Sequence, residues 1–161
     1  MRIYLADINL EMVLAYHKRF PERKLNVLRS FAGINRDDRE LGVTHRDKLN
    51  SLILDSGTFT INMAQQKPKL NLNLDTYQSY LLSFGQHYDF YFNFDVDFTQ
   101  HGFQTNLECQ RQLETAGLQP VPVIHDIYGA EVEYFIAQGY ELVAIGSNGA
   151  DQPVDLGGGQ L

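Results

Sequence analysis

Leu52-Ile53-Leu54-Asp55-Ser56-Gly57 places a carboxylate directly after a short apolar run. An apolar run that stops at a turn-forming Ser-Gly pair is typical of a buried β-strand. Enzymes built from alternating strands and helices keep their chemistry at the carboxyl ends of such strands. Asp55 is therefore a candidate site residue, and its strand is the point from which the other elements can be placed.

The composition is that of a folded, acidic domain. Of the 161 residues, 43% are hydrophobic and 12% aromatic, which is enough for one core. The net charge of -7 argues against broad, sequence-independent binding to nucleic acid, although it is compatible with a local basic patch. The single cysteine, Cys109, excludes an internal disulfide and a cysteine-rich zinc cluster, and no apolar run has membrane-spanning length. We expect a cytoplasmic domain that does not bind a membrane and contains no metal or cofactor.

Apolar runs alternate with helical patterns along the whole chain. Before Asp55, the pattern predicts a strand at 3–6, a helix from Leu10 that ends at Pro21, a strand at 25–31, and an exposed excursion or short polar helix at 35–48. After Asp55, the pattern predicts a helix capped by Asp75 with Gln78, followed by an aromatic strand at 90–94. It then predicts a helix that is capped by Thr105 with Glu108 and stopped by Gly117, followed by a strand at 121–124. The last expected elements are a helix stopped by Gly139 and a strand at 142–145.

Nearly continuous apolar strands between helices predict a parallel sheet that is buried on both faces. Such a sheet is either open and doubly wound or closed as a barrel. Asp55, Asp95, His125 and Asn148 each follow an apolar strand, and convergence of so many strand ends on one rim is typical of a barrel. We therefore expect a partial (β/α) TIM-type barrel over residues 1–150, with about five or six parallel strands. A flexible glycine-rich tail is expected over 151–161.

Several short motifs together suggest a family. Asp55-Ser56-Gly57-Thr58-Phe59 resembles the DSGGFQ signature of the tRNA-guanine transglycosylases, and more closely the form in their phage and bacterial relatives that insert 7-deazaguanines into DNA. Asn93-Phe94-Asp95 resembles an Asn-x-Asp element of those relatives, and residues 117–125 resemble their Gly-Leu-x-Pro-x-Pro-Val-x-His element. The resemblance extends over roughly residues 52–149, and the motifs agree in order and spacing.

This resemblance implies a base exchange on a TIM barrel, in which guanine in DNA, or less favourably in tRNA, is replaced by a 7-deazaguanine. Asp55 would act as the acid/base group, and Asp95 would accept hydrogen bonds from the donor edge of the purine. Ser56 and the amides around Gly57 would hold the carbonyl of the base. His125 would orient the substrate or a carboxylate. Asn148, placed on the same rim by the pattern of strand ends, is a further candidate substrate-binding residue.

The chain also departs from the family. In the transglycosylases a nucleophilic aspartate and a zinc site of three cysteines and a histidine lie in the C-terminal half, whereas only Asp151 and Asp155 follow the last expected strand here. A full barrel typically has about 250 residues, so the sequence predicts the front part of one. Two alternatives stay open: a catalytically silent partial barrel that self-associates through an exposed sheet edge, and an unrelated small-molecule barrel enzyme.

Overall fold

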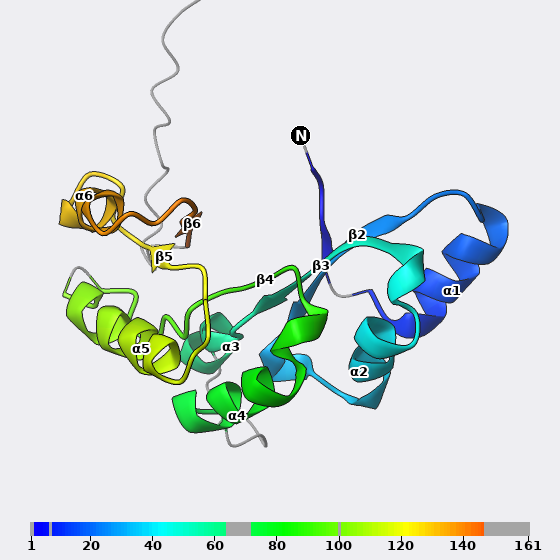
Figure 1. Ribbon diagram of the computed structural model, residues 1–161, viewed down its shortest axis with the longest axis horizontal. Helices are drawn as coiled ribbons and strands as arrows, with labels where there is room; N and C mark the ends of the chain where they lie inside the picture. Colours follow the sequence, from blue (N-terminus) through cyan, green and yellow to red (C-terminus); the bar gives the residue numbers. More distant parts are fainter. Residues whose placement is uncertain (1, 7, 64–71, 100, 147–161) are drawn as a thin grey trace, which may run out of the picture.

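The computed structural model describes residues 2–6, 8–63, 72–99 and 101–146 as an α/β fold with parallel strands (Figure 1). The strands are β1 (Leu5–Ala6), β2 (Leu25–Ser30), β3 (Leu49–Asp55), β4 (Phe90–Tyr91), β5 (Val123–Ile124) and β6 (Ala144–Ile145). The helices are α1 (Leu10–Arg19), α2 (Arg36–Val43), α3 (Thr58–Met63), α4 (Leu74–Phe84), α5 (Phe103–Thr115) and α6 (Ala130–Ala137). Asn148 and the expected tail lie outside the described residues.

The strands follow one another in space in the order in which they occur along the chain. A four-stranded parallel sheet has the order β1-β2-β3-β4, and β5 pairs with β6 in a second parallel sheet. A parallel bridge between Phe92 and Val121 joins the two sheets. The amide of Val121 donates to the carbonyl of Tyr91 at 2.8 Å, and the amide of Asn93 donates to the carbonyl of Val121 at 2.9 Å. The expectation of parallel strands in an α/β fold is confirmed.

The core is built around β3. Leu52 and Leu54 are fully buried on the face that packs against Val13 of α1 and Tyr77 of α4. Ser51 and Ile53, which alternate with them and point to the opposite face, are only 2% and 7% exposed. Burial on both faces explains why this strand reads as a nearly continuous apolar run. A second apolar cluster of Leu107, Ile124 and Phe135 connects α5, β5 and α6.

Two helix starts differ from those expected. Asn73, not Asp75, caps α4: its side chain accepts from the amide of Thr76, and the Thr76 hydroxyl accepts in return from the Asn73 amide. The predicted cap at Thr105 is also wrong, because α5 already begins at Phe103. The Phe103 ring packs edge-on against Tyr134 and Phe135 of α6, and this tertiary contact explains the earlier start.

Other differences concern the lengths of the elements. β1, β4, β5 and β6 have two residues each and are shorter than the apolar runs that contain them. Of the two alternatives for 35–48, the short polar helix is correct, since α2 occupies Arg36–Val43. Helix α3 follows the Ser56-Gly57 turn directly and is an element that the periodicity does not predict.

A buried ion pair ties α2 to the sheet. Arg29 of β2 and Asp38 of α2 form a salt bridge with side chains only 11% and 2% exposed. Arg29 also donates to the carbonyl of Ile8, and Asp38 accepts from the amide of Asn35 at 2.9 Å. Removing one partner of such a pair leaves an uncompensated buried charge.

We predict that Asp38→Ala lowers the free energy of unfolding by about 3–5 kcal/mol, because Arg29 then stays buried without its counter-ion. Glu40→Ala is the matched control, since Glu40 lies on the same helix and pairs with the exposed Arg36. That change should cost less than about 1 kcal/mol. Urea denaturation of the three proteins measures both effects, and equal losses in the two variants would contradict the assignment.

Candidate functional site

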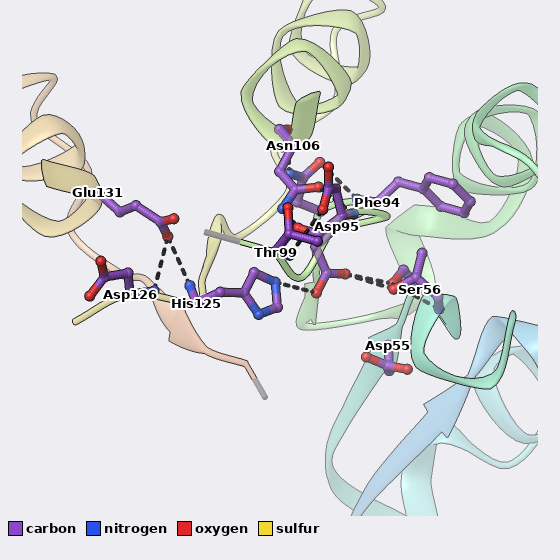
Figure 2. Close-up of polar contacts among 12 residues, drawn as sticks. Asp55, Ser56, Phe94, Asp95, Thr99, Asn106, His125, Asp126 and Glu131 are labelled. Carbon is purple, nitrogen blue, oxygen red and sulfur yellow. Dashed lines mark hydrogen bonds and ion pairs between the residues drawn. The ribbon is translucent and has the colours of Figure 1, made fainter. Parts of the chain in front are cut away.

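The ends of three strand regions meet at the carboxylate of Asp95 (Figure 2). Asp95 follows β4 and is 7% exposed. Its Oδ1 accepts from the hydroxyl of Ser56, after β3, and from the hydroxyl of Thr58, at the start of α3, each at 3.0 Å. Its Oδ2 lies 3.1 Å from Nε2 of His125, which follows β5. Asp95 is therefore held by side chains that follow strands of both sheets.

The loop that carries Asp95 is braced by two asparagines. Asn93 donates from Nδ2 to the carbonyl of Asn106 in α5 at 2.8 Å. Asn106 in turn accepts from the amide of Asp97 and donates to its carbonyl, at 3.0 and 2.7 Å. Asn93 and Asn106 are 1% and 4% exposed, so these bonds fix the loop on both sides of Asp95.

Asp55 lies beside this group, at the end of β3. Its Oδ2 accepts from the amide of Gly57 at 2.9 Å. Burial raises the pKa of the Asp55 carboxyl above its ordinary value, and the negative charge of Asp95 raises it further, against the opposing effect of the bond from Gly57. Asp55 therefore holds its proton to higher pH than a solvated aspartate does.

Gly57 adopts a left-handed backbone conformation, which strongly favours glycine at this turn. Its φ is +79°, and a Cβ placed on it would lie 2.6 Å from both the backbone nitrogen and the Cβ of Ala32. This close approach lets the chain turn so that Ser56 and Thr58, which are 0% and 2% exposed, both point at Asp95. The Ser56 hydroxyl and the Gly57 amide thus serve the two carboxylates, whereas we expected them to face a ligand carbonyl.

His125 is fixed on several sides. The amide of His125 donates to Oε2 of Glu131 at 2.8 Å, and Figure 2 shows this carboxylate reaching back from α6. The imidazole packs against the Phe98 ring, with 4.8 Å between the centroids. Gly146 leaves room for it, because a Cβ there would lie 2.6 Å from His125 Cε1.

The structure thus brings together five of the six expected site residues, namely Asp55, Ser56, Gly57, Asp95 and His125, while Asn148 lies outside the described residues. Sequence reasoning missed Thr58, Asn106 and Glu131. Thr58 belongs to the quoted motif, so its hydroxyl could have been considered, but Asn106 and Glu131 bind main-chain groups of adjoining loops, which leaves no recognisable motif. Among the described residues, no group of three or more His, Cys, Asp or Glu side chains is placed to bind a metal ion.

Comparison of the chain with protein-family models, curated proteins and solved structures finds no match. In the part of the chain that the structure describes, no helix combines the length and apolar character needed to cross a membrane.

Gly57→Ala should destabilise the fold more than Gly117→Ala. Both glycines have a positive φ, but a Cβ at Gly117 meets nothing within 4 Å, whereas one at Gly57 collides with Ala32. We expect Gly117→Ala to lower the free energy of unfolding by about 1–2 kcal/mol, the cost of the left-handed conformation, and Gly57→Ala to lower it by more. Chemical denaturation measures the difference, and equal losses would contradict the close contact.

Asp55→Asn should stabilise the protein at neutral pH. Because the pKa of Asp55 is raised above 3.8 in the folded state, the native protein binds more protons than the unfolded chain between 3.8 and the raised value. Stability from this group therefore falls as pH rises through that window. Asparagine cannot ionise and its Oδ1 still accepts from Gly57. The gain over wild type, measured by urea denaturation, should be largest at pH 7 and shrink toward about pH 4; a gain independent of pH would contradict the shift.

Proposed function

We propose that the Asp55–Asp95–His125 group is the base site of a guanine-exchange enzyme of the tRNA-guanine transglycosylase type. In the proposed reaction a guanine in nucleic acid, DNA rather than tRNA, is replaced by a 7-deazaguanine. The observation that carries the proposal is the proximity of two carboxylates, Asp55 and the buried Asp95, the second of which is braced by Ser56, Thr58 and His125.

The chemistry of guanine suits this arrangement. The Watson–Crick edge of guanine offers N1–H and an exocyclic amine, and an ionised carboxylate is purely an acceptor. Ser56 and Thr58 donate to Oδ1 of Asp95 and His125 lies against Oδ2, so the carboxylate is fixed in orientation and its remaining acceptor position, on Oδ2, is preorganised for one donor of guanine. Asp55, whose raised pKa keeps a proton available closer to neutral pH, is suited to acid/base work during departure and attack of the base.

Aromatic rings next to His125 are consistent with a flat ligand. Phe59 of α3 stacks on Phe98 with 6.3 Å between the centroids, and Phe98 in turn contacts the His125 imidazole. Half of Phe59 is exposed. A purine in this place could stack on an exposed ring face, which binds any base with similar strength. Selectivity for guanine would then come from Asp95.

The fold is proposed to be part of a (β/α) barrel. Six parallel strands in chain order, joined through the Phe92–Val121 bridge, support this topology, because an open doubly wound sheet places its later strands on the other side of β1. β1 and β6 are the outer strands of this series, and their residues Leu5 and Ile145 are 41% and 68% exposed. Self-association through such an edge remains a prediction.

Calorimetric titration with guanine, a 7-deazaguanine and adenine tests the recognition step. We predict that the first two bind and that adenine, which lacks the N1–H and 2-amino donors, does not. Asp95→Asn should weaken guanine binding by about tenfold to 100-fold, because an acceptor of charge-assisted hydrogen bonds is lost. Asp97→Asn is the matched control: Asp97 lies on the same loop with its side chain accepting from the Thr99 amide, and this change should leave affinity unaltered.

Incorporation of labelled guanine into DNA and into tRNA, with wild type and Asp55→Ala, tests the exchange itself. Incorporation that depends on Asp55 supports the proposed reaction. Guanine binding without incorporation would indicate a catalytically silent partial barrel that binds the base. Failure to bind guanine or a 7-deazaguanine would overturn the proposal and favour an unrelated small-molecule enzyme.

A further inference from the structure

Glu131 is a buried carboxylate that serves the loop of His125. It lies in the first turn of α6 and is 7% exposed. Its Oε2 accepts from the amide of His125 at 2.8 Å and approaches the amide of Asp126 at 3.5 Å. A carboxylate that accepts from main-chain amides forms strong, charge-assisted bonds. Glu131 therefore fixes the backbone at the point from which the imidazole projects.

The rest of this loop is compact. Asp126 accepts through Oδ1 from the amide of Tyr128 at 2.9 Å, and its carboxylate lies against Gly129, where a Cβ would approach Oδ2 to 2.4 Å. The loop is thus a tight turn between β5 and α6, closed by Asp126 on one side and by Glu131 on the other. A shift of α6 relative to β5 would move His125 with it.

We propose that Glu131 is a positioning residue of the site, which holds His125 at hydrogen-bond distance from Asp95 through the His125 main chain. His125 follows β5 of the two-stranded sheet, whereas Ser56 and Thr58 follow β3 of the four-stranded sheet. Glu131 thereby controls how the second sheet contributes to the carboxylate. The effect on ligand affinity rests on the proposed function, but the effect on the His125–Asp95 contact does not.

Glu131 also has a role that any acidic residue at this end of a helix would have. Glu131 and Glu133 both lie in the first turn of α6, where negative charge stabilises the helix dipole. Glu133 is exposed, and among the described residues the hydrogen bonds seen for the 125–128 loop go to Glu131 and Asp126 rather than to Glu133. Glu133→Ala is therefore the matched control that removes the dipole effect alone.

The experiment follows the Nε2–H proton of His125, on the nitrogen that faces Asp95, by NMR in the full chain. Its signal is assigned by its loss in His125→Gln. In wild type, Glu133→Ala and Glu131→Gln, whose amide oxygen still accepts, we expect a downfield proton that exchanges slowly with water. In Glu131→Ala the exchange should become at least about tenfold faster, the equivalent of one lost hydrogen bond. Guanine affinity should fall by a similar factor in Glu131→Ala and return in Glu131→Gln.

Each outcome of this experiment either supports or contradicts the positioning role of Glu131. Equal exchange rates in Glu131→Ala and wild type, or no protected His125 proton in wild type, would overturn the positioning role. An equal effect of Glu133→Ala would overturn it in favour of the helix dipole. If Glu131→Ala does not fold, Glu131→Asp replaces it, because the shorter side chain withdraws the carboxylate from the His125 amide. If wild type fails to bind guanine, the proposed function falls while the NMR comparison still decides the role of Glu131.

Discussion

The carboxylate of Asp95 is the constraint to which the surrounding structure conforms. A buried carboxylate is costly unless hydrogen-bond donors surround it, and here the donors come from segments nearly 70 residues apart, from Ser56 and Thr58 to His125. The β3–α3 turn and the β5–α6 loop must therefore reach the same point. Sequential pairing of short parallel strands brings them there, and the bridge between Phe92 and Val121 places the two sheets in register just before the carboxylate.

The placement of the site could be predicted from the sequence for a simple physical reason. Parallel strands share one carboxyl edge, so polar residues that follow apolar runs must come near one another once the runs are recognised. The apolar runs before Asp55, Asp95 and His125 were sufficient for this. Strand length did not matter, since β4 and β5 have only two residues each and their trailing side chains still meet.

The parts that could not be predicted depend on contacts between different elements of the fold. Asn106 and Glu131 bind main-chain atoms of loops, and the residue type alone does not reveal which loop. The start of α5 was misplaced because the packing of Phe103 on α6 outweighs a plausible capping sequence at Thr105. The capping residue of α4 was misassigned for a different reason. Asn73 and Asp75 have similar capping chemistry, and the local sequence does not distinguish them.

The two carboxylates of the site differ in their surroundings, and this difference argues for separate roles under the proposed function. Donors from three side chains surround Asp95, which suits a fixed acceptor that recognises a ligand. Asp55 is partly buried next to that negative charge, and its pKa is raised by burial first and by Asp95 second. A pair of like groups with unlike environments is how proteins obtain an acceptor and an acid from the same residue type. If the proposed function is correct, recognition falls to Asp95 and proton transfer to Asp55, because Asp95 itself helps to keep the proton on its neighbour.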